Sequence, residues 1–157
     1  MNGDESGILV QEIARDIVAD VAPQELPIFP AVSTAYLANP AGALRLGRRS
    51  DPVLGFGAEA VTALLTTAVM YILSEVLKIL AEAARKAATD GLSKEGTALV
   101  AAMFKRFRTP AAPALGETEL AAIQSRIVSA GRELRLTDDK IDLLVKAVSA
   151  QLATKET

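Results

Sequence analysis

The fold is decided by residues 52–88, PVLGFGAEAVTALLTTAVMYILSEVLKILAEAARKAA. Asp51 and Pro52 form a cap and first-turn pair that favours a helix start, and apolar residues then recur at helical spacing. No charged residue occurs from Ala60 to Leu73, whereas charged residues recur after Ser74. A helix that is apolar on all sides must be surrounded by protein or by lipid. The sequence therefore predicts one long helix over 52–88 whose surroundings decide the function.

Three environments would satisfy this helix: the core of a bundle, a contact with copies of itself, or a lipid bilayer. The charge-free run between Glu59 and Glu75 is 15 residues long. A membrane-spanning helix needs about 20 apolar residues, so the bundle core is favoured over the bilayer. The predicted interaction or membrane face consists of Val61, Leu65, Ala68, Val69, Ile72, Val76 and Ile79.

The preceding and following segments also show helical spacing of apolar residues. Further helices are expected over residues 8–21, 31–38, 40–46 and 94–107. Residues 22–30 hold three prolines and are expected to be non-helical. The longest charge-free run, 26–44, contains prolines that exclude a spanning helix, so we expect a mostly buried segment or one docked in a groove.

A helical hairpin is predicted at the C-terminus, behind a proline- and alanine-containing linker at 109–116, TPAAPALG. Its first helix runs from about 117 to 134, and Thr137 is expected to cap the second. The predicted partner face of the hairpin consists of Ile127, Leu134, Ile141, Leu144 and Val148. The chain thus divides into a helical bundle with an acidic N-terminal arm (1–108), the linker (109–116) and the hairpin (117–157).

Composition supports an all-α fold, a helical bundle around the long central helix at about 52–88. The 157 residues include 29 alanines and only six aromatic residues, which suits closely packed helices. Cysteine and histidine are both absent. Disulfides, thiolate nucleophiles, cysteine-ligated zinc and the commonest general base are therefore excluded. The acidic, polar start does not resemble a secretory signal, so we expect a cytoplasmic protein with possible membrane association.

Charge is unevenly distributed along the chain. Residues 1–44 carry a net charge of −5, residues 45–108 carry +4 and residues 109–157 carry −1. Anionic surfaces would contact the basic middle segment through Arg45, Arg48, Arg49, Lys105, Arg106 and Arg108. This layout is typical of ordinary scatter of surface charge, and the alternative is an acidic arm that folds over the basic segment and masks it. Nucleic acid is not expected as a partner, because the hairpin lacks a basic footprint.

Two short motifs resemble catalytic or cofactor-binding patterns. Gly55, Gly57 and Ala60 match a relaxed dinucleotide fingerprint, but no strand is predicted on either side of it. Ser74 and Lys78 lie one helical turn apart, and Lys78 also has acidic neighbours at helical spacing, which favours a solvated ion-pair stripe. Neither motif predicts an enzyme, a cofactor, a metal or a small-molecule substrate.

The remaining function class is interaction through helical surfaces. The stretch from Gly55 to Lys86, followed by MFKRFR and the hairpin, resembles small Ala-, Leu- and Arg-rich helical proteins of bacteria. We expect a non-enzymatic interaction or assembly protein that binds a protein partner or forms a homo-oligomer. The alternative is an autoinhibited membrane-active protein, membrane-inserting or pore-forming, that uses helix 52–88.

Overall fold

The computed structural model describes residues 3–48, 57–87, 100–107 and 115–153. Within these ranges the chain is all-α, as predicted, and contains no strand. The α-helices are α1 (Gly3–Val21), α2 (Phe29–Ala38), α3 (Pro40–Arg48), α4 (Gly57–Ala87), α6 (Glu117–Glu133) and α7 (Asp138–Gln151), and the short 3-10 helices are η1 (Pro23–Glu25) and η3 (Lys105–Phe107).

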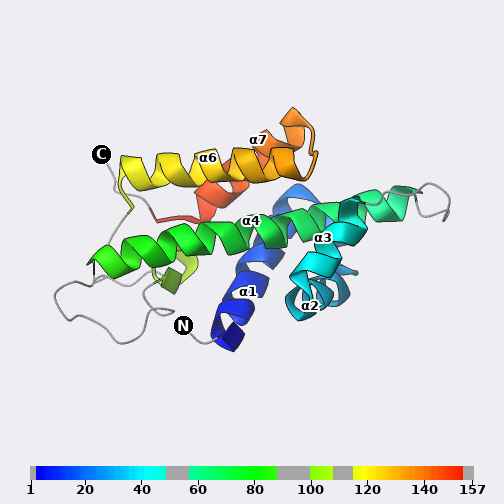
Figure 1. Cartoon of the computed structure of the whole chain (residues 1–157), viewed down its shortest axis with the longest axis horizontal. Coiled ribbons are helices and arrows are strands. Elements are labelled where there is room, and N and C mark those ends of the chain that lie inside the picture. The colour runs from blue at the N-terminus through cyan, green and yellow to red at the C-terminus, as the bar shows by residue number, and fades with distance from the viewer. Residues whose placement is uncertain (1–2, 49–56, 88–99, 108–114, 154–157) are drawn as a thin grey trace.

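Helix α4 contacts most of the other helices. Its 31 residues pack against α1, α2, α3 and α6, while α7 packs against α6 and α1. Figure 1 shows α6 running alongside α4 on one side and α1, α2 and α3 on the other. Residues 52–56 and 88, which were predicted to belong to the same helix, lie outside the described residues.

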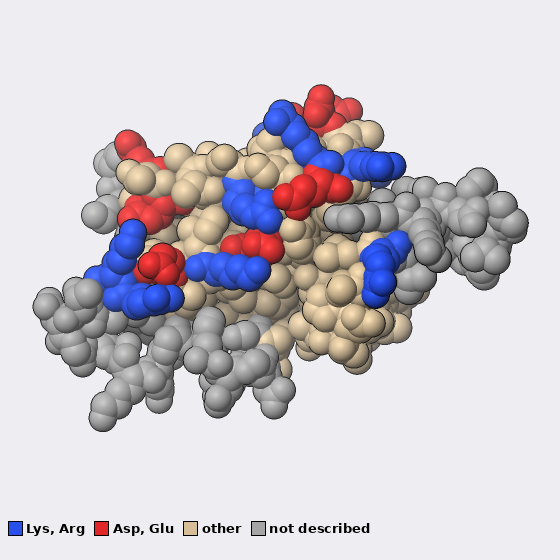
Figure 2. Space-filling model, in the orientation of Figure 1, with Lys and Arg blue, Asp and Glu red and all other residues tan. Residues whose placement is uncertain are grey.

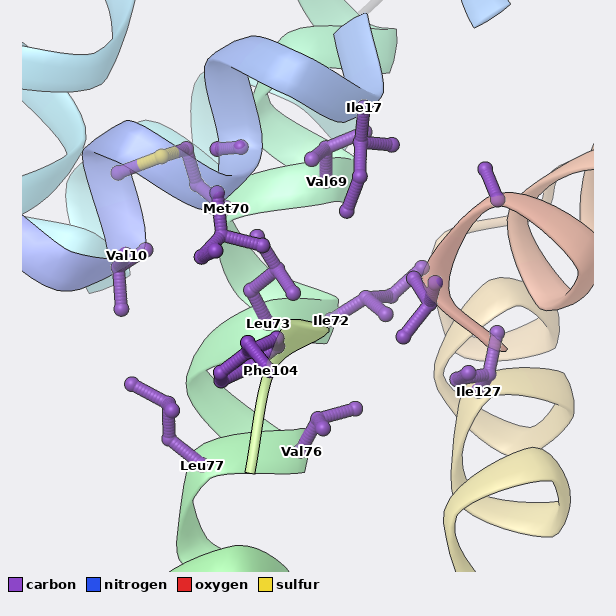
Figure 3. Packing of buried hydrophobic residues seen from close by; sticks show 14 of the residues in the cluster. Val10, Ile17, Val69, Met70, Ile72, Leu73, Val76, Leu77, Phe104 and Ile127 are labelled. Carbon is purple, nitrogen blue, oxygen red and sulfur yellow. The ribbon is translucent and has the colours of Figure 1, made fainter. Parts of the chain in front are cut away.

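The apolar core surrounds the middle of α4. Ile72 points toward Ile127 of α6, and Val69 lies beside Ile17 of α1 (Figure 3). All four side chains are at most 1% exposed. From Thr66 to Leu73 every residue except the partly buried Tyr71 is buried, so this portion of the uncharged stretch is surrounded by protein.

The C-terminal hairpin forms as its sequence predicts. The Thr137 Oγ1 accepts a hydrogen bond from the Lys140 backbone N–H at 3.4 Å, which confirms Thr137 as the cap of α7. The turn places Arg135 at a φ of 60° and directs the Leu136 N–H to the Gly131 carbonyl at 2.9 Å. A β-carbon on Gly131 would lie 2.6 Å from Ile141 Cγ1, so glycine allows α6 and α7 to approach closely here.

Two sequence predictions are wrong in their local structure. The helix predicted over 94–107 does not reach its end, because the described part turns at Ala102 and Phe104 forms an isolated bridge with Leu152. Phe104 is fully buried, so tertiary packing overrides the helical pattern. The proline-rich crossing at 22–30 is not entirely non-helical either, since it contains η1 and the first turn of α2. Residues 94–99 lie outside the described residues.

Candidate functional site

The candidate site is an uncharged surface on α2 and the start of α3. We define the uncharged face by its exposed members: Pro27, Ile28, Pro30, Ala31, Thr34, Ala35, Leu37, Ala38, Asn39, Pro40 and Ala41. The prediction that the charge-free run 26–44 is mostly buried is therefore wrong. Figure 2 shows charged side chains spread over α4 and α6, while the surface over α2 and most of α3 is free of them.

Helix α2 exposes this face because only one narrow side of it is anchored. Phe29, Ser33 and Tyr36, spaced four and three residues apart, are its buried residues. The Ser33 hydroxyl accepts a hydrogen bond from Gln11 Nε2 at 3.1 Å and donates to the Pro30 carbonyl at 3.3 Å. These contacts fix the rotation of α2, so the residues on its opposite side face outward.

Large apolar side chains flank the small residues of the uncharged face. Ile28 is 39% exposed before the first turn of α2, and Leu37 is 36% exposed in its last turn. Leu37 also lies against Gly7 of α1, at 3.5 Å from the position that a β-carbon on Gly7 would occupy. The next residue of α1, Ile8, is 58% exposed. The apolar surface therefore includes residues of α2 and a nearby exposed residue of α1.

The sequence-predicted faces lie elsewhere in the molecule. On α4, Ala68, Val69, Ile72 and Val76 are buried, Leu65 and Ile79 are partly buried, and the side chain of Val61 lies outside the described residues. The hairpin side chains Ile127, Leu134, Ile141, Leu144 and Val148 are all at most 3% exposed. In this conformation the hairpin set packs inside the chain, and the described members of the α4 set are buried or partly buried.

The basic residues do not form one cluster in the described part of the chain. Arg45 is exposed on α3, whereas Lys105 and Arg106 are exposed on η3. Arg106 Nη1 lies 2.9 Å from Asp16 Oδ2 of α1, so this ion pair joins the acidic arm to the basic segment. The side chain of Arg48, and all of Arg49 and Arg108, lie outside the described residues.

A buried carboxyl group, which the sequence did not single out, joins η1 to α4. Glu25 is 1% exposed, and its Oε1 accepts hydrogen bonds from the backbone N–H of Thr66, at 3.0 Å, and from the Thr66 hydroxyl. Its other oxygen, Oε2, has no hydrogen-bond partner. Burial raises the pKa of Glu25, although the Thr66 hydrogen bonds and the charge of Lys140 act to lower it.

A second polar cluster joins α4 to α6. The Tyr71 hydroxyl donates to Glu133 Oε2 at 2.7 Å, and Arg126 donates to the Tyr71 hydroxyl at 3.1 Å and to Glu133 Oε1 at 3.2 Å. Burial, followed by the Glu133 hydrogen bond, raises the pKa of Tyr71. Burial acts to lower the pKa of Arg126, but its hydrogen bonds with Glu133 and Tyr71 outweigh burial and the pKa is raised. Each group is thus occupied in holding the two helices together.

The Ser74 and Lys78 pair is occupied by other partners. The Ser74 hydroxyl donates to the Met70 carbonyl at 2.8 Å, and Lys78 Nζ lies 3.2 Å from Glu75 Oε1. This ion pair between residues three apart is the solvated stripe that the sequence predicts for Lys78. A serine nucleophile needs a base within hydrogen-bond reach, and here the ammonium group is bound to a carboxylate.

Within residues 3–48, 57–87, 100–107 and 115–153, no group of three or more acidic residues is arranged to hold a metal ion. None of the helices in these ranges combines the length and the apolar character needed to cross a bilayer.

Comparison with known proteins gives no family. No protein-family model matches the chain, and no match was found among the curated proteins or the solved structures.

Proposed function

We propose that this protein acts without catalysis, by binding another protein chain through the uncharged face of α2 and α3. The observation that carries the proposal is that eleven of the 19 residues in the charge-free run 26–44 are exposed. At the chain average of 23% charged residues, a stretch of 19 residues would carry about four charges, and this one carries none. Apolar, uncharged surface of this kind is characteristic of the central part of protein–protein interfaces.

The anchoring of α2 supports a binding role. Its buried residues and the Gln11–Ser33 hydrogen bond hold the helix against α1 and α4 from the inside. The outward residues are then presented on a helix whose rotation is already set, so binding does not have to order it. A preorganised helical surface binds a partner at lower entropic cost than a segment that folds on binding.

The other predicted surfaces give less support in this conformation. The hairpin face is buried, and the described part of the long-helix face is buried or partly buried, so neither is fully available unless α6 or α1 leaves α4. The membrane-active alternative therefore requires a large rearrangement, and it stays a prediction. The uncharged face requires no rearrangement.

Site-specific photo-crosslinking tests the proposed function in the cells that make the protein. A photoreactive phenylalanine analogue at Thr34 is expected to form protein adducts, and the same residue at Ala150, an exposed position on α7, is expected to form none. Adding Ala35→Lys should abolish the adducts from position 34, because a charge would be buried in the interface. Absence of adducts from position 34, or equal adducts from both positions, would contradict the proposal.

A further inference from the structure

We propose that the chain bound by the uncharged face is a second copy of this protein, joined by pairing of α2 with α2 about a two-fold axis. This inference rests on the proposed function and names its partner. Two properties of the face support it. The face is uncharged, as the same face of a copy is, and small side chains lie in a row along α2.

Charge matching favours a second copy. The whole of residues 26–44 is uncharged, so the face offers no counter-charge to a partner. Charged groups of a partner that were buried against it would lose water without gaining an ion pair. In a two-fold dimer the same patch meets itself, so a copy brings an equally uncharged surface. Elsewhere in the described residues, charged side chains occur on the exposed parts of α1, α4, α6 and α7.

Small side chains on α2 permit close approach of the two helices. Ala31, Thr34, Ala35 and Ala38 are spaced at three and four residues, lie on one side of α2 and are all exposed. The distance between packed helices is set by the side chains at the contact, so this row brings two α2 helices close together. Ile28 and Leu37 flank the row near its two ends, where each would cover apolar surface of the partner.

The ends of α2 limit how far the contact extends. Pro27 and Pro30 precede and begin the helix, and Asn39 follows it. Asn39 Oδ1 accepts a hydrogen bond from the Gly42 N–H at 3.1 Å, which starts α3 and turns the chain. Arg45 is the first charged residue after the face and is exposed on α3. The pairing is therefore expected to be centred on α2, with the charge of Arg45 at its margin.

Sedimentation equilibrium of the purified chain tests this dimer. The wild-type protein is expected to dimerise reversibly, and Ala35→Lys is expected to weaken the dimer at least about tenfold, because two like charges meet near the two-fold axis. Ala150→Lys is the matched control, since it places the same charge at an exposed alanine in the last turn of α7. It should leave the dimer unchanged. Circular dichroism should show the same helical content for all three proteins.

The absence of cysteine in the chain allows a second, covalent test. Single cysteines at Ala31, Ala35 and Ala38 place a thiol at successive positions along the row. With the two-fold axis near Ala35, this position lies close enough to its copy for a disulfide, which needs Cα atoms about 4.4–6.8 Å apart. Mild oxidation is expected to cross-link that variant much faster than an Ala150→Cys control.

The outcomes separate this inference from the proposed function. A wild-type chain that stays monomeric, a dimer that survives Ala35→Lys, or cross-linking no faster than in the control would each overturn the α2 pairing. In the cells, adducts from position 34 that contain a different protein would uphold the proposed function and overturn self-association. Adducts of twice the mass of the chain, together with the loss of the dimer in Ala35→Lys, would support both.

Discussion

At the scale of single residues, Glu25 is the most unusual group in the described chain. It is a carboxyl group buried against α4, and only one of its oxygens is hydrogen-bonded. Glu25 accepts a hydrogen bond from the backbone N–H of Thr66, which lies within α4. In a helix this N–H ordinarily donates to the carbonyl group one turn earlier, so the Glu25 carboxylate competes with that carbonyl. Glu25 therefore fixes the position of η1 on α4, but burial of its charge opposes folding when the group is ionised.

Glu25 predicts a pH dependence of stability with a definite sign. Its pKa in the folded state is raised above the ordinary value of 4.5, so the folded protein binds the proton more tightly than the unfolded chain does. Its contribution to stability is thus fully present below pH 4.5 and is lost as the pH rises through the folded-state pKa. Glu25→Gln keeps the acceptor for Thr66 and cannot ionise, so it should remove this dependence.

Urea unfolding of both proteins between pH 4 and pH 8 measures the effect. The free energy of unfolding of the wild type, relative to that of Glu25→Gln, should fall as the pH rises above the ordinary pKa of glutamate. Glu12→Gln is a control, because Glu12 lies on α1 and is only partly buried. A difference between wild type and Glu25→Gln that is constant with pH would contradict the raised pKa.

The sequence indicates that Glu25 is unusual, but it does not identify Thr66 as its hydrogen-bond partner. Glu25 is the only charged residue between Asp20 and Arg45, and an isolated acid in an apolar segment suggests a specific environment. Thr66 is 41 residues away along the chain, and nothing in a single sequence pairs the two. Local patterns can therefore mark such a group, but they cannot say where it is buried.

At the scale of elements, local chemistry was sufficient where the chain neighbours decide the structure. The hairpin and its Thr137 cap were predicted because caps and apolar spacing act within a few residues. The helix predicted over 94–107 was wrong at its end, because there the backbone of Phe104 pairs with that of Leu152, a residue 48 positions later in the chain. The exposure of α2 was missed for a similar reason, since an uncharged sequence does not show which side is covered.

The same substitution, glycine to alanine, is expected to have opposite effects on stability at Gly7 and at Gly131. Gly7→Ala should stabilise the protein by about 0.5–1 kcal/mol, because alanine favours the helix and its β-carbon would lie 3.5 Å from Leu37, an ordinary contact. Gly131→Ala should instead destabilise it by about 1–3 kcal/mol, because its β-carbon would lie 2.6 Å from Ile141 Cγ1 in the buried contact between α6 and α7.

Thermal and urea unfolding of the two variants check this pair. The same chemical change is made in two helices, so helix propensity alone would stabilise both. Opposite signs would show that the distance between neighbouring helices decides the outcome. Stabilisation by Gly131→Ala would mean that α7 moves away from α6 without cost, and would contradict close packing at this crossing.

At the scale of the whole molecule, the hairpin is joined to the rest of the chain by both core and backbone contacts. Ile123, Ile127 and Leu144 belong to the same buried cluster as the apolar residues of α1 and α4. The Ala153 N–H donates to the Met103 carbonyl at 2.8 Å, and the Ala153 carbonyl accepts from the Leu115 N–H at 3.2 Å. These contacts lead us to expect that the hairpin and the bundle unfold together.

Ile127→Ala tests this cooperativity, and with it the predicted boundary at 109–116. Ile127 is fully buried and faces Ile72, so its truncation should lower the free energy of unfolding by about 2–5 kcal/mol (Figure 3). Because the core is shared, the loss should appear as one earlier transition in both far-UV circular dichroism and the fluorescence of the two tyrosines, Tyr36 and Tyr71. Leu143→Ala, at a half-exposed position of α7, should change stability by less than about 0.5 kcal/mol.

If Ile127→Ala instead splits the transition into two steps, with part of the helical signal retained after the first, the hairpin is a separate folding unit behind its linker. The mutual burial of α4 and α6 would then be a docking contact and not a common core.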